Sequence, residues 1–464
     1  MAITDQQYEL WLSQPNKPRV VLAELEHSAG TEYVASRPYI SKPTDTDPNR
    51  IYDDLLQGEL EISTRIDSQL DLGALDLVDD GSITEWTGYL WRGYSVVLKL
   101  GDPSWSLDDF RVIARQINGG VINASRGKIQ LGIYDATAKL QADIERPELP
   151  SGSLVPLVLG EVFCAPATRI STSTLTYRVS WLSVTSLVVR DGNGPIMSHT
   201  ADYSSGQFVA SAYSPRTLMC EVDEPHKTPM QIVQWIADLY GITLASGISL
   251  PTYTLGLRYD GAVTGAQVLD DVCTAIGGHW QITELGELVV RVFELPSAPP
   301  GLVIDADDIE FGQIALAETQ EPLKNLTLNY SRNHNPVSEV AGSISATEAE
   351  RLMSEWQAVS GSNTVTDYPL APDQSLDTAL QDKVDAETER DRRLAIKNAR
   401  HDVYQITALM AGLSDVVGQS VRVDHPRTAG RIGRIISVTS SPHKDKAELE
   451  IWYCVKKPTA HPRG

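Results

Sequence analysis

The residues of this chain most suited to chemistry are its nine histidines and its many carboxylates. The histidines stand alone, because no HExxH or HxH spacing brings two imidazoles to one metal ion. His279 precedes Trp280 at the start of an expected strand, and His425 precedes Pro426, so both are interpreted as structural or turn residues. No GxSxG elbow and no Walker-type phosphate loop occurs. The sequence therefore predicts no catalytic, metal-binding or cofactor-binding residue and no cofactor, although the paired carboxylates of a glycosidase would leave no signature.

One acidic run, Asp305 to Glu310 (DADDIE), superficially resembles a calcium-binding loop. An EF-hand loop needs a glycine at its sixth position and a distal glutamate. This run has glutamate at the sixth position and no distal glutamate. A capped turn is the preferred interpretation.

The cysteines and four of the tryptophans are the remaining candidates. The cysteines are Cys164, Cys220, Cys273 and Cys454. They have no CxxC spacing, so we expect buried small hydrophobic residues, with a disulfide or an iron–sulfur site as the lesser alternative. The tryptophans are Trp86, Trp91, Trp105 and Trp181. They could line a sugar-binding face, but large aromatic residues on strands favour a core or a subunit interface, and we prefer the interface.

The charge and length of the chain restrict its class. With 464 residues, two to four domains are expected, because single cores stop growing well below that length. The net charge of -22 argues against binding to DNA phosphates. The acidic charge could serve solubility, or it could line a lumen that repels DNA and lets it slide through. No secretory leader and no apolar stretch near the roughly 20 residues of a bilayer span occurs, so we expect a product made in the cytoplasm, without membrane insertion.

The elements that must position these residues are mostly strands. Alternating apolar residues predict short strands between turns over the first 225 residues. They are Arg19–Glu26 with a return at Tyr33–Ser36, a set from Gly58 through Thr64, Ser82–Leu100 with bulges, Lys128–Tyr134, Val155–Val162, Thr174–Val189 and Gly206–Tyr213. For Ser106–Gln116, strand and short helix both remain open.

Helical signals appear further along. One helix is predicted from Pro229 to a stop at Gly241, and a second over Gly265–Ile276, followed by a hairpin of His279–Ile282 and Glu287–Phe293. A capping signal at Ser345 precedes a helix that ends before Gly361. The charged segment Asp377–Arg400 predicts a longer helix that is mostly solvated or faces a partner, with acids early and bases late.

The order of elements near the C-terminus resembles that of a known family. The helix Asp377–Arg400 precedes the strands of Leu413–Tyr453 (GQSVRVDHPR, GRIISV, LEIWY), and Val268–Leu295 (including IGGHWQITELGELVVRVFEL) lies upstream. This order resembles the C-terminal part of baseplate-hub proteins of long-tailed bacteriophages over about Met230 to Tyr453. The resemblance implies two tube-type β-barrel domains per chain, with other domains inserted between them or outside them.

The resulting fold class is mainly β with an α+β insert: two small tube-type β-barrel domains, an α+β module and a helical excursion. The predicted domains are an N-terminal tube-like barrel (1–147), a β-rich extension (148–225), the α+β module (226–298) and a C-terminal tube-like barrel (299–464) with a helical insertion at about 345–402. Whether 148–225 completes the first barrel stays open. No internal repeat is visible in the sequence.

Three functions remain. The preferred one is a structural, non-enzymatic virion protein: a homotrimeric baseplate hub, assembled in the host cytoplasm, that joins a hexameric tail tube to a three-fold tip. Its partners would be sister copies, distal tail or tail-tube proteins, spike or fibre proteins, and phage DNA passing through a channel without specific binding. The second is a tail-tip adhesin for host glycans or pili, and the third a cell-wall or polysaccharide hydrolase.

Overall fold

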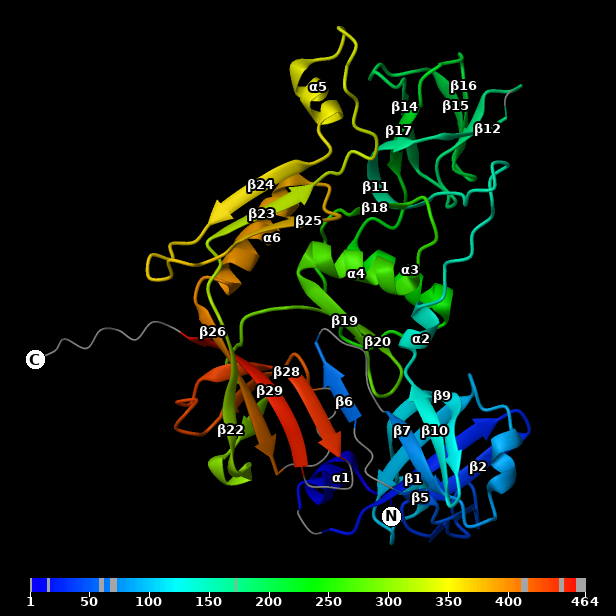
Figure 1. Ribbon diagram of the computed structural model, residues 1–464, viewed down its shortest axis with the longest axis vertical. Coiled ribbons are helices and arrows are strands. Elements are labelled where there is room, and N and C mark those ends of the chain that lie inside the picture. The colour runs from blue at the N-terminus through cyan, green and yellow to red at the C-terminus, as the bar shows by residue number, and fades with distance from the viewer. Residues whose placement is uncertain are drawn as a thin grey trace, which may run out of the picture.

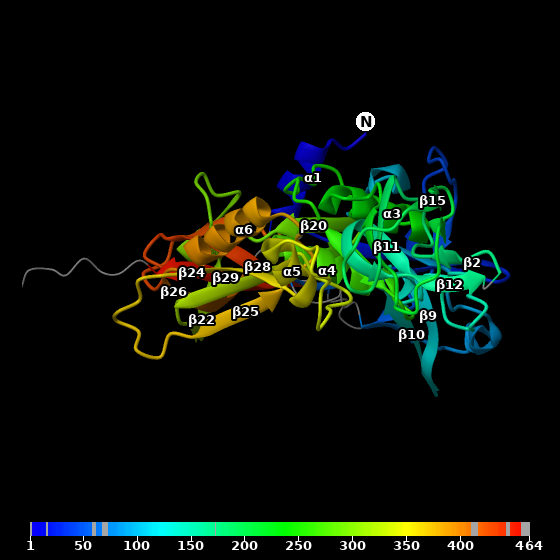
Figure 2. The ribbon, with the colours of Figure 1, turned by 90° about the horizontal axis from the view of Figure 1, so that it is seen from above.

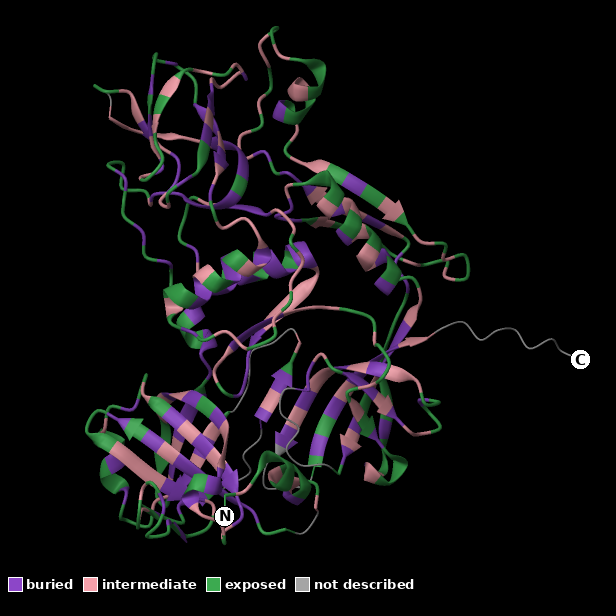
Figure 3. Ribbon diagram, turned by 180° about the vertical axis from the view of Figure 1, so that it is seen from behind, coloured by how far each residue is buried: buried purple, intermediate pink, exposed green. Residues whose placement is uncertain are grey.

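The computed structural model describes residues 2–14, 17–57, 62–66, 73–171, 173–409, 416–441 and 446–455. The chain is mainly β, with an α+β insert between two barrel-like sheets built from its first and last parts. The two sheets lie side by side at one end of the molecule, below the insert in Figure 1. Buried and exposed residues alternate along their strands in Figure 3, as expected where one face of a sheet packs on a core.

The N-terminal barrel is a seven-stranded sheet in the order β2-β1-β8-β9-β10-β7-β5. Its strands are β1 (Val20–His27), β2 (Gly30–Ala35), β5 (Leu56–Gln57), β7 (Ala74–Val78), β8 (Ser95–Gly101), β9 (Arg111–Ser125) and β10 (Lys128–Tyr134). A bridge between Val34 and Asp53 joins the β2 edge to the segment that enters β5. Backbone hydrogen bonds therefore close the sheet on itself.

Short elements cover this barrel. Helix α1 (Asp5–Leu12) begins at a Thr4–Gln7 capping box and buries Trp11, whose Nε1 donates to Asp102 Oδ2 at 3.3 Å. The others are β3 (Tyr39–Ile40), β4 (Ile51–Tyr52) and the 3-10 turns η1 (Thr84–Gly88) and η2 (Leu107–Asp109). Helix α2 (Thr137–Leu140) follows β10 and packs instead in the core of the α+β insert.

The C-terminal sheet has the order β21-β27-β28-β29-β26-β22. Its strands are β21 (Leu302–Ile304), β22 (Ile309–Gln320), β26 (Arg400–Ala408), β27 (Ser420–Val423), β28 (Ile432–Ser441) and β29 (Lys446–Val455). The predicted alternation over Leu413–Tyr453 is confirmed for the described residues, because Leu449, Ile451 and Tyr453 face the core. Residues 413–415 and 442–445 of that stretch lie outside the described residues.

The two sheets share one strand order once the edge strand β2 of the N-terminal sheet is left out. Numbered along the chain, strands β1, β5, β7, β8, β9 and β10 stand in the spatial order 1-4-5-6-3-2. Strands β21, β22, β26, β27, β28 and β29 stand in the same order. One pair differs in direction, since β1 runs antiparallel to β8 whereas β21 runs parallel to β27. The sequence shows no repeat, yet the topology is duplicated.

The β-rich extension forms two four-stranded sheets around one core. One contains β14 (Ser186–Arg190), β17 (Met219–Asp223), β11 (Leu157–Pro166) and β18 (Gly256–Tyr259). The other contains β12 (Thr168–Ser171), β13 (Thr176–Arg178), β16 (Gln207–Ala210) and β15 (His199–Asp202). Because β18 follows α3 in sequence, the predicted second and third domains share a sheet.

Capping residues in the local sequence determine where the two helices of the α+β module begin and end. Helix α3 (Pro229–Tyr240) starts at a Thr228–Gln231 capping box and ends at Gly241, whose φ of 60° is left-handed. Helix α4 (Gly265–Ile276) starts at a Thr264–Gln267 box and ends at Gly277, with φ 58°. Glycine suits both ends because it has no Cβ to clash there. The predicted hairpin is confirmed as β19 (Gly278–Ile282) and β20 (Leu288–Val292).

The helical excursion is only partly helical. Helices α5 (Ala346–Met353) and α6 (Lys383–Ile396) flank β24 (Gln357–Ser362) and β25 (Asp373–Asp377), which pair with β23 (Asn325–Tyr330). Gly361, expected beyond a helix end, lies within β24. The predicted helix Asp377–Arg400 is too long, because α6 spans Lys383–Ile396 and only Asp377 and Arg400 lie in β25 and β26. Asp382 caps the start of α6, where its side chain accepts from the Val384 amide.

Two predicted strands were also wrong in extent. The aromatic-rich stretch from Ser82 begins with the turn η1, and only its end forms β8. The stretch Thr174–Val189 is not one strand, because β13 and β14 belong to different sheets. The open segment Ser106–Gln116 contains both a 3-10 turn and the start of β9. The set from Gly58 is confirmed over Ile62–Arg65, and residues 58–61 lie outside the described residues.

Candidate assembly interface

One short strand joins the two barrels. Strand β6 (Ile62–Arg65) lies between β5 and β7 in sequence but pairs with β28 of the C-terminal sheet. Ser63 Oγ lies 2.9 Å from Thr439 Oγ1, and the Ile66 amide donates to the Ile436 carbonyl at 2.9 Å. The side chain of Ile62 packs in the N-terminal core. The C-terminal sheet thus accepts an added strand from the other barrel.

The α+β module contributes a second connection. The carbonyl of Glu284, in the β19–β20 turn, accepts from the Arg115 amide at 2.7 Å and from Gln116 Nε2 at 3.1 Å on β9. On the other side, Arg291 Nη1 of β20 donates to the Val417 carbonyl at 2.7 Å. One hairpin therefore contacts both barrels and fixes their separation.

The edges of the two barrels differ. In the N-terminal barrel, the β2 edge is bridged through Val34 to Asp53, just before β5. In the C-terminal sheet, β22 pairs only with β26 among the described strands. This edge bulges between Ile309 and Ile314, and Phe311 at the bulge is 100% exposed. A long exposed strand edge offers backbone groups to another chain.

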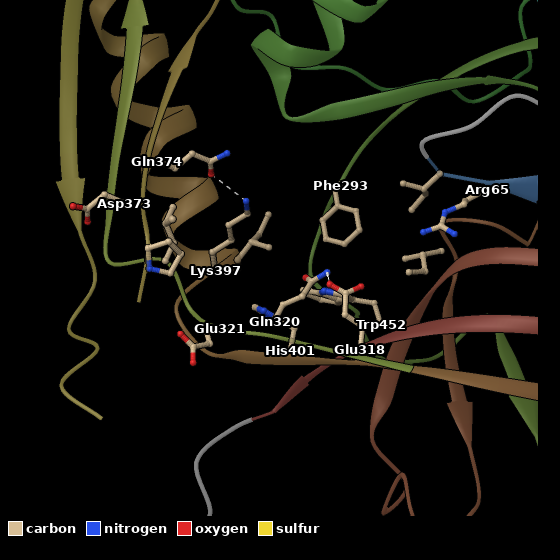
Figure 4. A pocket seen from close by; sticks show the side chains of 15 residues that line it. Arg65, Phe293, Glu318, Gln320, Glu321, Asp373, Gln374, Lys397, His401 and Trp452 are labelled. Carbon is tan, nitrogen blue, oxygen red and sulfur yellow. Dashed lines mark hydrogen bonds between the residues drawn. The ribbon is translucent and has the colours of Figure 1, made fainter. Parts of the chain in front are cut away.

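One groove lies between the C-terminal barrel and the excursion. Its cavity volume is about 680 Å³. Figure 4 shows Trp452 and His401 close together with Phe293 above them, between Arg65 on one side and Asp373 on the other. Lys397 Nζ lies 3.2 Å from Gln374 Oε1. Burial, and then the neighbouring Arg393, lower the pKa of Lys397. The lining therefore mixes apolar and charged side chains.

His401 forms the buried part of this groove. Its ring stacks on Trp452 with centroids 4.1 Å apart and an interplanar angle of 15°. The residue is 2% exposed, and burial lowers its pKa to about 4, with the Lys397 charge acting in the same direction. The imidazole is therefore neutral at pH 7 and acts as a flat packing group.

The buried imidazole predicts acid sensitivity. In the unfolded chain a histidine takes up a proton near pH 6.5, whereas folded His401 does so only near pH 4. The unfolded state binds more protons in that window, so stability is lost as pH falls from about 6.5 toward about 4. Replacing His401 with phenylalanine should keep the stacking and weaken this loss. Urea unfolding at about pH 7 and about pH 5 measures it, and an equal loss in both proteins would contradict the prediction.

A buried ion cluster anchors helix α6, a cluster that sequence reasoning missed. Glu389 is fully buried and accepts from Arg392 Nη2 at 2.7 Å and from Arg393 Nε at 2.6 Å. Arg392 also donates to the Ile276 carbonyl at 2.9 Å, at the C-terminal end of α4. The early acids and late bases indicated a match to the helix dipole on a helix that is mostly solvated or faces a partner. In the structure, Arg392 and Arg393 donate to carbonyls of α4 in the same chain. Sequence alone gave no sign of the burial.

The other candidate residues have structural positions. His425 accepts from Thr428 through its carbonyl at 3.1 Å, so the predicted turn is confirmed. Asp305 and Asp308 cap each other around η3 (Ala306–Asp308), which confirms the capped turn. His279 lies in β19 beside a second cavity of about 620 Å³. Across the described ranges, no three His, Cys, Asp or Glu side chains gather where they could hold a metal ion.

The cysteines and tryptophans are mainly core residues. Cys164, Cys220 and Cys273 are buried, and burial raises the pKa of Cys164 to about 12, while Cys454 is half-buried in β29. Trp86 and Trp91 are 6% and 1% exposed in the N-terminal core, so the preferred interface role was wrong for them. Trp105 and Trp181 are partly buried against cores. These side chains therefore form no open aromatic face for a sugar.

No family model and no curated protein matches the chain. Solved structures give weak matches. The prophage tail protein gp18 from Listeria monocytogenes EGD-e matches with 8% identity, coverage of 96% of each chain and a TM-score of 0.45. A tail protein from Neisseria meningitidis MC58 matches with 11% identity, 94% of this chain, 96% of the other and a TM-score of 0.43. The 43 kDa tail protein of prophage MuSo2 from Shewanella oneidensis matches with 9% identity, 93% and 98% coverage and a TM-score of 0.42.

Two of these structures are described as prophage tail proteins and the third as a tail protein. At TM-scores below 0.5, the likeness does not by itself assign a function to this chain. In the described residues, no helix combines the length and the apolar character needed to cross a bilayer.

Proposed function

We propose that the chain is a structural virion protein of a bacteriophage tail, the baseplate hub at its distal end. The observation that carries this proposal is the duplicated strand order of two barrel-like sheets joined side by side. A chain with two similar barrels can present six barrels from three copies. That number matches a six-fold tube on one side and a three-fold tip on the other. The family resemblance over about Met230 to Tyr453 supports the same assignment.

Closed symmetry is the physical reason for three copies. An edge that meets a different surface on the next copy generates either a ring or an open filament. Strand addition between like barrels, already present at β6 and β28, would place successive barrels at a regular angle. In a closed ring of six barrels each docking edge meets a neighbour, which removes the risk of runaway pairing along those edges.

The charge fits a channel for DNA. A net charge of -22 repels phosphate groups, so a genome would pass the lumen without specific binding. The hub's partners are sister copies, distal tail or tail-tube proteins, and a central spike or fibre protein. Its location is the tail tip of the virion, after assembly in the host cytoplasm. We assign it no catalytic activity.

Native mass spectrometry of the purified full chain tests the proposal. The expected result is a complex of three copies of the 50.8 kDa chain. A monomer at every protein concentration, together with a single copy per tail, would contradict it. Incubation with peptidoglycan, capsule and a glycan array should give neither hydrolysis nor binding. Release of reducing ends, or saturable glycan binding, would favour a hydrolase or an adhesin instead.

A further inference from the structure

Strand β9 is longer than the strand beside it. Strand β8 pairs with Arg111–Ile117 of β9, and the next hydrogen bonds on that side are between Asn118 and residues 93 and 94. From Val121 to Ser125, the strand pairs with β10 alone among the described residues. The backbone groups on the β8 side of this half have no strand partner in the described part of the chain. Figure 2 shows the β9–β10 hairpin projecting from the body of the molecule.

In the C-terminal barrel, the strand equivalent to β9 has a pairing partner at the corresponding position. Strand β28 is fifth in the shared order, as β9 is. Its first part, Ile432–Arg434, pairs with β27, the fourth strand. Beyond the start of β27, Ser437–Ser440 pairs with β6 on the side opposite β29. Within the described ranges, the same half of the same strand therefore has an added strand in the C-terminal barrel and none in the N-terminal barrel.

The sequence at the open half lacks the usual protection of an edge. Native edges are commonly blocked by charged residues, proline or a short strand. Residues 121–125 read VINAS, without a charge or a proline. Ile122 is 54% exposed on the outer face, and residues 123–125 are exposed. An uncharged, exposed strand edge of this kind is suited to pairing with another strand.

We propose that the open half of β9 (Val121–Ser125) accepts an antiparallel strand from the C-terminal barrel unit of a second copy of this chain. The strand comes from the excursion between its second and third barrel strands, residues 321–399. This inference rests on the proposed function, because it names the contact that closes the ring of barrels.

The shared strand order identifies the donor. Strand β6 lies in the connection between the second and third strands of the N-terminal barrel, and it pairs with the fifth strand of the adjacent barrel. In the C-terminal barrel that connection is residues 321–399, and its strands β24 and β25 each pair only with β23 among the described strands. Within one copy, the N-terminal barrel adds β6 to the C-terminal barrel. If the C-terminal barrel likewise adds a strand from residues 321–399 to the N-terminal barrel of the next copy, the contacts within and between copies are equivalent. Three copies then close into a ring.

A charged substitution at the open edge tests the inference. In Ile122→Asp, a carboxylate replaces an exposed apolar side chain at the docking strand. The matched control is Ile40→Asp, the same change in the same barrel at a site 61% exposed, against 54% for Ile122. Sedimentation over a protein dilution series gives the dissociation constant of the trimer. We expect Ile122→Asp to weaken assembly about 30-fold or more, and Ile40→Asp to change it less than about 3-fold. Circular dichroism confirms that both variants fold.

A photocrosslink identifies the occupant. Benzoylphenylalanine at position 122 of the full chain is irradiated in the wild-type background, and the crosslinked peptides are mapped by mass spectrometry. A crosslink to residues 321–399 of a second copy is the expected result. A crosslink within the same chain, to any other part of a second copy, or to another tail protein overturns the inference.

The outcomes separate the two proposals. If the wild-type chain is a trimer but Ile122→Asp behaves like Ile40→Asp, the docking inference is wrong and the hub proposal stands. If the wild-type chain is a monomer at all concentrations and in the tail, both are wrong.

Discussion

Replacing Glu389 with alanine should lower the free energy of local unfolding around α4 and α6 by about 3–5 kcal/mol. Glu389 is fully buried, and its carboxylate is the common acceptor for Arg392 and Arg393. Without it, two guanidinium groups remain close together with no counter-charge. Their hydrogen bonds to the last carbonyls of α4 would be retained, but these cannot compensate the lost ion pairs.

Hydrogen exchange of the α4 amides measures this effect locally, which suits a chain of several domains. A loss of 3 kcal/mol or more corresponds to exchange about 150-fold faster. The matched control on the same helix is Glu387→Ala, whose exposed pair with Lys383 spans 3.7 Å. It should cost less than about 0.5 kcal/mol. Equal exchange rates in the two variants would show that the buried cluster contributes no more than a surface pair.

Replacing Trp91 with alanine should destabilise the N-terminal barrel by about 3–5 kcal/mol. The side chain is 1% exposed, and its Nε1 donates to the Trp86 carbonyl at 2.7 Å. It contacts the rings of Trp86 and His27, with centroids 5.7 and 4.7 Å away. Truncation would leave a cavity among side chains that cannot all move into it.

Hydrogen exchange of the β1 and β8 amides measures this loss of stability. Tyr213→Ala, at a site 63% exposed, is the control and should change stability by less than about 0.5 kcal/mol. The measurement also separates a core from an interface role. If Trp91 were an interface residue, its replacement would raise the dissociation constant of the trimer and leave hydrogen exchange in the isolated subunit unchanged. That result would contradict the core assignment.

Elements with local signals were predictable from the sequence. Helices α3 and α4 carry Thr–Gln capping boxes and a stopping glycine, and both lie where the pattern indicated. Strand β10 has the predicted bounds, Lys128 to Tyr134, because its alternation is regular and glycines precede it. In each case the interactions that define the element lie within a few residues of one another.

Long-range pairing could not be predicted in the same way. The second strand of the shared order is two residues long in one barrel (Leu56–Gln57) and twelve in the other (Ile309–Gln320), so no repeat is visible in the sequence. The pairing of Thr64 with Val438 joins residues far apart in the chain, and nothing near either residue indicates it. The burial of Glu389 also depends on a helix more than a hundred residues away.

The most direct test of the account is an electron cryomicroscopy image of the purified assembly viewed along its axis. The duplicated strand order predicts six barrel-sized densities around a hollow centre, alternating between two kinds with three-fold symmetry. A single molecule without a ring, or a ring in which N-terminal and C-terminal barrels do not alternate, would contradict the claim that each chain contributes two equivalent barrels to one channel.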